Sequence, residues 1–440
     1  MTASGMLLAL LSVLPAAGAQ SPSPGPQPGV QGGGQPGAAA LRPAEPSKPP
    51  AAPAVAAPAV APAAAGAAPA AKPPAAPTAP ATTAAAKPAA ASGGAVPFVV
   101  TAPWAAPSQA PGARQPELSA AQRWEPPPLN LKAPPPLTPQ QRAIVQATKS
   151  EKLPEPTWLR YVLSNEWRHD VTFPKLAGLG GVYIGVATDQ NYTMAAAMSA
   201  ELLVTMDYDA EVVAMHRIYH AFINASPTAQ EMRAWFKAEN AYKAGEFLVN
   251  TAPNKEDGAR LAKIYARYRD RVAVYLWHVA NTRVGSRHPT WLGDPEAYGY
   301  IRALVQGGRV LAVQGDLNGT TTLRSIGDTA RALGLNVHVL YTSNAEGFFK
   351  YTQNFRDNIE SLPRDDKSVM LRTFKHGMVS PPGDMWHYNL HQMNDFIERL
   401  KLPGYVNIYR VMQDLQRTPE GKKATEAIGV SYYDATVPRG

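Results

Sequence analysis

The chain has 440 residues, no cysteine and a formal charge of +8. Without cysteine it can hold no disulfide, zinc-thiolate site, cysteine nucleophile or lipid-modified cysteine. Half of the positive excess lies in a Pro/Ala-rich segment and the rest forms no dense Lys/Arg block, so we expect no nucleic-acid partner.

Residues 1–19 have the pattern of a secretory signal. An apolar run at residues 6–14 precedes the small residues Ala17, Gly18 and Ala19, although no Lys or Arg comes before it. The run is too short to span a bilayer, and we expect no transmembrane segment elsewhere. The sequence therefore predicts export to the periplasm or cell envelope; with a signal that is not genuine, the protein would be cytoplasmic.

Residues 20–136 consist mainly of Pro, Ala, Gly, Ser and Gln. Such a composition offers too little apolar surface to offset the entropy of ordering, and proline favours extended backbone. We predict a disordered tether, which is a candidate for contacts with cell-envelope components. Residues 137–440 are long enough to form one large domain.

The first ordered element is expected to be a helix within residues 137–150. Thr138 can cap it, Pro139 suits its first turn, and Gln141 completes a capping box. A second short helix is predicted at residues 156–167.

Short apolar runs then alternate with helix-length segments. Runs that are apolar along their whole length are typical of strands buried on both faces of a parallel sheet. We therefore predict an α/β fold with a doubly wound, mainly parallel sheet. Residues 226–281 interrupt the alternation with two segments of helical spacing, which predicts a helical insertion near the carboxyl edge of the sheet and a candidate lid. The predicted strands lie at residues 182–187, 201–207, 308–316, 335–344 and 368–374.

Polar residues gather where the first strand ends. Ligands of open α/β sheets bind outside the carboxyl ends of the strands. Gly185 permits close backbone approach there, and Asp189, Gln190 and Asn191 open the next helix. All four are predicted to bind a cofactor, although for Asp189 a helix-capping role is favoured.

Asp207 ends the second strand, 22 residues after Gly185. A carboxylate at about this spacing can accept hydrogen bonds from both hydroxyls of a ribose. Asp316 likewise ends a predicted strand. For both residues a ligand contact and a structural role remain open, whereas Asp209 is expected to cap the following helix.

The glycine pattern limits the ligand. The stretch GVATDQN lacks the G-x-G-x-x-G fingerprint, and the chain has no G-x-x-x-x-G-K-[ST] motif. Both absences disfavour a bound pyrophosphate. A small-molecule ligand of the nucleoside type, without phosphates, is compatible with this weaker loop.

The stretches VYIGVATDQNYTMAAAM, VLAVQGDLNG and VHVLYTSNAEGFF resemble a family of uncharacterised bacterial proteins. The core of that family is similar to class I S-adenosylmethionine-dependent methyltransferases, and the resemblance covers roughly residues 158–400. It implies S-adenosylmethionine as cofactor, with Gly185 near its methionine part, Asp207 at its ribose and Asp316 near the transferred methyl group. Two departures are Ala187, where another glycine is usual, and the absence of an aromatic methyl-acceptor motif after Asp316.

The loop YTSNAEGFFKY follows the fourth predicted strand and supplies the remaining catalytic candidates. Glu346 would serve as general base if burial raised its pKa, and Asn344 and Asp316 complete the predicted catalytic set. Alternatively, Asn344 caps a helix and Phe348 and Phe349 belong to the core. Arg372, in an otherwise apolar strand, is expected to pair with a buried carboxylate.

Two histidine pairs are candidate metal ligands. His216 and His220 are four residues apart, as are His387 and His391, which would place each pair on one helical face. Partly buried polar histidines are the favoured interpretation, and we predict no metal site. Three hypotheses remain: a methyltransferase-like enzyme, an exported non-catalytic Rossmann-like module held at the envelope, and a metal-dependent hydrolase.

Overall fold

The computed structural model describes residues 125–129, 131–157, 160–375, 378–425 and 429–438. The expected signal and most of the expected tether lie outside these residues. The last part of the expected tether is described, and there Leu129, Leu131 and Ala133 pack, partly buried, against the core. Packing against the domain therefore begins before residue 137.

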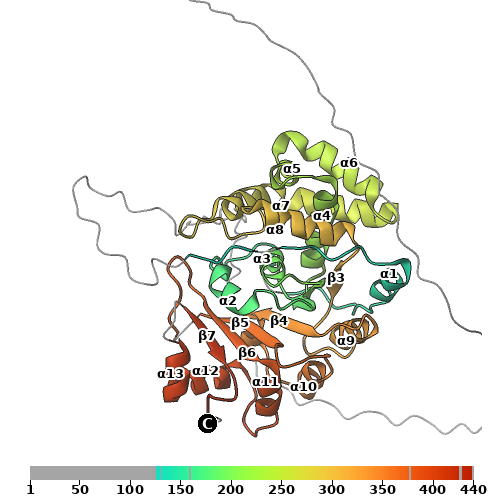
Figure 1. Ribbon diagram of the computed structural model, residues 1–440. Helices are drawn as coiled ribbons and strands as arrows, with labels where there is room; N and C mark the ends of the chain where they lie inside the picture. The colour runs from blue at the N-terminus through green and yellow to red at the C-terminus, as the bar shows by residue number, and fades with distance from the viewer. Residues whose placement is uncertain (1–124, 130, 158–159, 376–377, 426–428, 439–440) are drawn as a thin grey trace, which may run out of the picture. The chain divides into compact units, whose positions relative to one another are not determined.

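Within the described residues, seven strands form one sheet in the order β3-β2-β1-β4-β5-β6-β7 (Figure 1). Strands β1 to β5 are parallel, β6 is antiparallel to β5, and β7 runs parallel to β6. The predicted fold class, a doubly wound and mainly parallel α/β sheet, is confirmed. The strands are β1 (Val182–Gly185), β2 (Leu202–Asp207), β3 (Val310–Gln314), β4 (Val337–Ser343), β5 (Val369–Phe374), β6 (His387–Gln392) and β7 (Val430–Tyr433).

Helices cover both faces of the sheet. The α-helices are α1 (Pro139–Gln146), α2 (Phe173–Leu176), α3 (Gln190–Ala197), α4 (Ala210–Ala225), α5 (Ala229–Ala234), α6 (Ala241–Thr251), α7 (Lys255–Asn281), α8 (Pro295–Gln306), α9 (Thr322–Ala332), α10 (Gln353–Glu360), α11 (Met393–Leu400), α12 (Ile408–Arg417) and α13 (Pro419–Thr425). Short 3₁₀ helices are η1 (His169–Thr172), η2 (Ala238–Asn240) and η3 (Ala345–Phe348).

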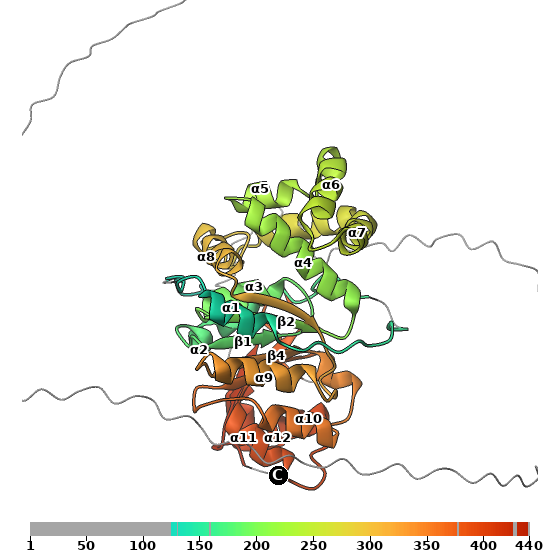
Figure 2. The same cartoon turned by 90° about the vertical axis from the view of Figure 1, so that its right-hand side faces the viewer.

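Alternation along the strands divides the core into two clusters. Tyr183 and Leu203 point to the face covered by α3, α4, α7 and α8, whereas Ile184 and Val204 point to the face covered by α9, α10, α11 and α12. Figure 2 shows these two helical layers on either side of the strands. Because both faces are covered, the central strands are apolar throughout, which is why the sequence revealed them.

Of two helices predicted before the first strand, one is present in the described residues and the other is not. The capping box of α1 is present, with Thr138 and Gln141 each accepting from the backbone of the other. The helix predicted at residues 156–167 is wrong: residues 160–167 contain no helix. This segment instead crosses the carboxyl end of the sheet, where its side chains make contacts with distant strands.

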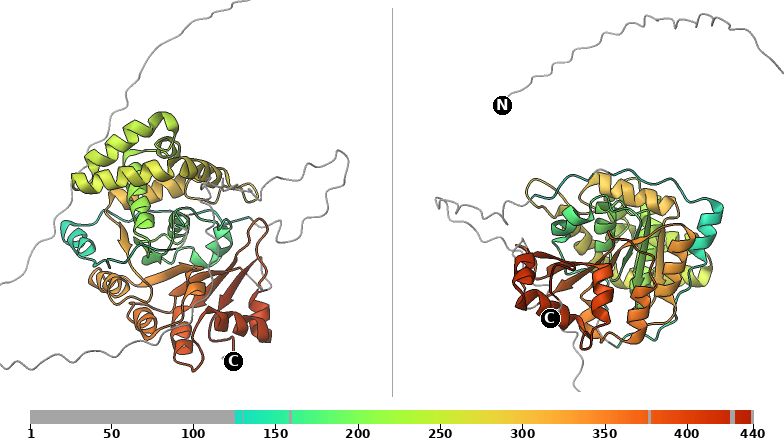
Figure 3. Two further views of the ribbon diagram at one scale, coloured as in Figure 1. Left: turned by 180° about the vertical axis from the view of Figure 1, so that it is seen from behind. Right: turned by 60° about the horizontal axis from the view of Figure 1, so that its bottom comes forward.

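The residues of the expected helical insertion form α5, η2, α6 and α7, which pack with α4 away from the strands (Figure 3). Glu211 links α4 to α7, because its carboxylate accepts from Arg267 and from the hydroxyl of Tyr268, both on α7. Among the described helices, none combines the length and apolarity needed to cross a bilayer.

Candidate functional site

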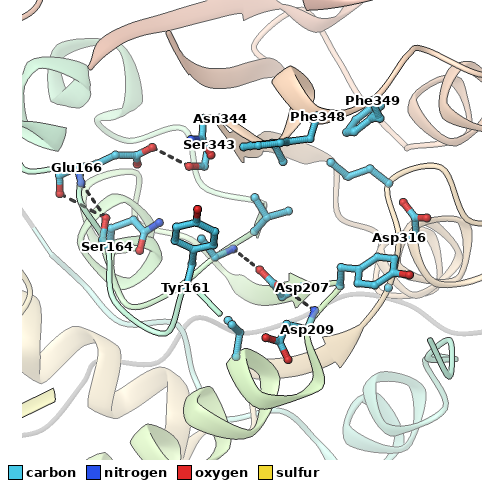
Figure 4. Close-up of a pocket in the computed structure, with 18 of the residues that line it drawn as sticks. Tyr161, Ser164, Glu166, Asp207, Asp209, Asp316, Ser343, Asn344, Phe348 and Phe349 are labelled. Atoms are coloured by element: carbon cyan, nitrogen blue, oxygen red, sulfur yellow. Dashed lines mark hydrogen bonds between the residues drawn. The ribbon is translucent and has the colours of Figure 1, made fainter. Parts of the chain in front are cut away.

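A cavity of about 510 Å³ opens at the carboxyl ends of β1, β2, β3 and β4 (Figure 4). Strands β2 and β3 follow on one side of β1, and β4 and the later strands follow on its other side. The cavity therefore lies at the switch in strand order, where doubly wound sheets bind ligands. It is lined by Tyr161, Leu163, Ser164, Asn165, Glu166, Val186, Ala187, Gln190, Asp207, Tyr208, Asp209, Val212, Gly315, Asp316, Leu317, Asn318, Ser343, Asn344, Ala345, Phe348 and Phe349.

Asp207 lies in the cavity wall at the end of β2. Its Oδ2 accepts from the backbone N–H of Ala187 at 2.9 Å and its Oδ1 from that of Asp209 at 2.8 Å. Burial raises the pKa of Asp207 to about 6, although these backbone donors act in the opposite direction. The carboxylate keeps acceptor capacity for a ligand hydroxyl beside its backbone donors Ala187, Tyr208 and Asp209, because each of its oxygens has two lone pairs.

The loop after β1 holds a left-handed residue beside Asp207. Ala187 has φ +68°, a conformation that non-glycine residues rarely adopt. Its N–H bonds Asp207, and its carbonyl accepts from His216 Nε2 at 2.8 Å. Burial lowers the pKa of His216 to about 4, so the imidazole is neutral at pH 7 and accepts from the Tyr192 hydroxyl through Nδ1 at 2.7 Å. His216 therefore fixes a wall of the cavity.

Of the predicted cofactor-binding residues in this loop, Gln190 lines the cavity and Gly185 and Asn191 do not. Asn191 is buried, donates to the carbonyls of Val186 and Thr188 at 2.8 and 2.7 Å, and accepts from the Tyr183 hydroxyl at 3.0 Å. A Cβ at position 185 would lie 1.9 Å from Asn191 Oδ1. Gly185 is thus required for the packing of Asn191 and not for approach to a ligand.

The expectations for Asp189 are also corrected. It does not line the cavity, and its side chain does not cap α3. Its fully buried carboxylate accepts from the Trp291 indole N–H at 2.9 Å. Burial raises the pKa of Asp189. Asp209, in contrast, caps α4 as expected, with Oδ1 accepting from the N–H of Glu211.

The predicted catalytic set does not come together. Asp316 and Asn344 both line the cavity, but they follow β3 and β4, which lie three strand spacings apart, or about 14 Å. Figure 4 shows them on opposite sides of the cavity. Asp316 therefore lies beyond Asp207 at the edge of the sheet, too far from Asn344 for the two side chains to act on one atom.

Glu346 does not reach the cavity. Its carboxylate is buried, accepts from Arg372 Nε at 2.8 Å and also accepts from the hydroxyls of Thr342 and Tyr351. A carboxylate held by an ion pair and two hydroxyl donors is unsuited to the predicted role of general base. The expectation that Arg372 pairs with a buried carboxylate is confirmed, and Glu346 is that partner.

Sequence reasoning missed Glu166, a buried carboxylate in the cavity wall at the β4 end. It accepts from the hydroxyls of Ser343 at 2.6 Å, Thr373 at 2.8 Å and Tyr341. Ser343 has φ +51°, so a second left-handed residue borders the cavity. The available signal was an acidic residue between the apolar residues of YVLSNEW, but its partners come from strands far along the chain.

The histidine pairs do not form a metal site. His387 and His391 lie on strand β6, not on a helix, so they are about 13 Å apart along the strand. His391 Nε2 donates to the Asp395 carboxylate at 2.9 Å, and burial lowers the pKa of His391 to about 3. Among the described residues there is no group of three or more side chains of His, Cys, Asp or Glu placed to hold a metal ion.

No curated protein matches the chain. Among solved structures, the chain is similar to the rRNA methyltransferase aviRa from Streptomyces viridochromogenes, with 12% sequence identity and a TM-score of 0.22 over 48% of this chain and 72% of that one.

The family model described as a domain of unknown function, DUF7790, matches residues 161–430. That range contains strands β1 to β6, the first residue of β7 and the residues that line the cavity. The chain belongs to the DUF7790 family.

Proposed function

We propose that the cavity binds S-adenosylmethionine or a related nucleoside without phosphates, as in a methyltransferase-like enzyme. One observation carries the proposal: Asp207 ends β2 beside the switch point, lines the cavity and has a carboxylate that keeps acceptor capacity. A ribose presents two adjacent hydroxyls that can donate to such a carboxylate. Gln190, at the start of α3, is the other predicted cofactor-binding residue that lies in the wall.

The charge of the wall supports a ligand without phosphates. The charged side chains that line the cavity are carboxylates, and no Lys or Arg is found among the described lining residues. A phosphate in the cavity would have no cationic partner in the wall. The carboxylates would instead attract the sulfonium and ammonium groups of S-adenosylmethionine. The loop after β1 also lacks the glycine pattern that accommodates a pyrophosphate.

Calorimetric titration of the purified 440-residue chain with S-adenosylmethionine, S-adenosylhomocysteine and ATP tests the proposal. We expect micromolar binding of the first two and much weaker binding of ATP. Asp207→Ala removes two charge-assisted hydrogen bonds to the ribose and is expected to weaken binding at least about 100-fold. Asp328→Ala, an exposed carboxylate on α9 outside the cavity, is the matched control and should bind as the unmodified chain does.

Absence of binding by the unmodified, folded chain at millimolar ligand contradicts the proposal. The exported, non-catalytic Rossmann-like module would then be the better hypothesis. Because Asp207→Ala also deprives the N–H groups of Ala187 and Asp209 of their acceptor, Asp207→Asn is needed as a second variant of nearly equal size.

Binding should also depend on pH through Asp207. Its pKa of about 6 means that the carboxylate, which accepts from ligand hydroxyls, is lost as the pH falls through 6. With 5′-methylthioadenosine, which lacks the amino-acid part, we expect affinity to be constant above pH 7 and to fall by up to about tenfold per pH unit below 6. Asp207→Asn has no such proton to bind, so its weaker affinity should be flat from pH 5 to 8. A flat profile for the unmodified chain would exclude Asp207 as the acceptor.

A further inference from the structure

The carboxylates of the cavity wall are spread along its length. Glu166 lies at the β4 end and Asp316 at the β3 end, with Asp207 and Asp209 between them. An ion pair between Arg160 and Asp209 Oδ1, at 2.7 Å, partly offsets this charge. A ribose held by Asp207 engages only one of the four carboxylates, so the rest of the wall needs another explanation.

Asp209 points to a second ligand group. Its side chain is buried, with the residue only 3% exposed, yet Oδ2 has no hydrogen-bond partner among the described residues. Buried polar atoms are normally paired, and an unpaired one in a cavity wall is explained by a group that binds there. Because a carboxylate oxygen only accepts, the group must be a donor.

Two large aromatic side chains line the same cavity but remain open to solvent. Tyr161 is 53% exposed and Phe348 is 78% exposed. They come from separate segments, one preceding β1 and the other at the end of η3, and Figure 4 shows both rings over the cavity. Aromatic faces attract organic cations, particularly where carboxylates add to the negative potential.

We propose that the cavity binds a second ligand, an organic amine or ammonium group carried on an apolar body, beside the nucleoside. The amine would donate to the free oxygen of Asp209 or to Glu166, and the apolar body would lie against Tyr161 and Phe348. Anionic ligands are disfavoured because the described lining residues offer four carboxylates and no Lys or Arg. The inference rests on the proposed function, since it names what fills the part of the cavity that the nucleoside leaves open.

Three probes of similar size separate charge from shape: phenethylamine, 2-phenylethanol and 3-phenylpropanoate. Each is titrated into the 440-residue chain, free and saturated with S-adenosylhomocysteine. We expect phenethylamine to bind at least about tenfold more tightly than the alcohol, and the carboxylate to bind most weakly. Equal or tighter binding of the carboxylate, or no amine binding up to about 10 mM, would overturn the inference.

Variants of the two aromatic residues locate the site. Phe348→Ala and Tyr161→Ala are each expected to weaken amine binding by roughly 2- to 30-fold, and to weaken S-adenosylhomocysteine binding less than amine binding. Tyr161→Phe keeps the ring and should retain most of the affinity. Tyr242→Ala is the matched control, because Tyr242 is an exposed aromatic on α6 outside the cavity. Unchanged amine affinity in both alanine variants would contradict the proposal.

The outcomes separate the two proposals. Binding of S-adenosylhomocysteine without amine binding rejects the amine site and leaves the proposed function intact. Amine binding that is sensitive to Phe348→Ala, without any nucleoside binding, supports the amine site and rejects the proposed function.

Discussion

Replacing Arg372 with methionine is expected to lower the free energy of unfolding by about 3 to 5 kcal/mol. Arg372 and Glu346 are both almost fully buried, and the guanidinium Nε lies 2.8 Å from the carboxylate. Methionine fills a similar length but leaves the Glu346 carboxylate in the core without its counter-charge. The remaining donors, the hydroxyls of Thr342 and Tyr351, do not replace that charge. Urea unfolding followed by circular dichroism measures the change.

Two further variants control this experiment. Arg372→Met combined with Glu346→Gln removes both charges and should recover much of the loss, because the penalty comes from the unpaired carboxylate. Arg331→Ala breaks an exposed ion pair with Asp328 and should change stability by less than about 1 kcal/mol. A loss below about 1 kcal/mol for Arg372→Met itself would show that Glu346 does not need its partner.

The second large effect is expected for Gly185→Ala. The added Cβ would lie 1.9 Å from Asn191 Oδ1 and 2.7 Å from the Tyr183 ring, so Asn191 must leave its position. Asn191 would then lose its bonds to the carbonyls of Val186 and Thr188, which shape the loop at the cavity. We expect stability to fall by about 3 kcal/mol and nucleoside binding to be lost.

Gly299→Ala is the matched substitution. Gly299 lies inside α8, and a Cβ there would meet nothing within 4 Å. Because alanine is the better helix former, this change should stabilise the protein by about 0.5 to 1 kcal/mol. Equal melting temperatures of Gly185→Ala and Gly299→Ala in thermal unfolding would contradict the tight packing of Asn191 against Gly185.

The parallel half of the sheet was predictable from the sequence, and the antiparallel half was not. Strands β1, β2 and β4 are apolar runs buried on both faces, a pattern with few alternatives. Strand β6, HYNLHQ, contains buried polar side chains that find partners only in the folded protein. His387 and Asn389 bond to Ser431 of β7. Such a strand does not show the apolar pattern by which strands are recognised.

Only those residues of the candidate site that are close in sequence to a recognisable strand could be predicted. Asp207 and Gln190 lie where strand-end reasoning places ligand contacts, because they are close in sequence to the strands that position them. Gly185 ends β1 and Glu346 follows β4, but Gly185 packs against Asn191 and the Glu346 side chain is buried in the core. Tyr161 and Glu166 were missed because they belong to a segment whose spacing resembled a helix and whose conformation depends on distant strands.

The segment that carries Tyr161 and Glu166 also affects the order in which the cavity can form. Glu166 bonds Ser343 and Thr373, which are 177 and 207 residues further along the chain. The bond between Ala187 and Asp207 spans only 20 residues. Contacts that close long loops form slowly, because the loss of chain entropy precedes the stabilisation they provide. One half of the cavity is therefore expected to assemble with the first βαβ unit, and the other half only after β4 and β5 have joined the sheet.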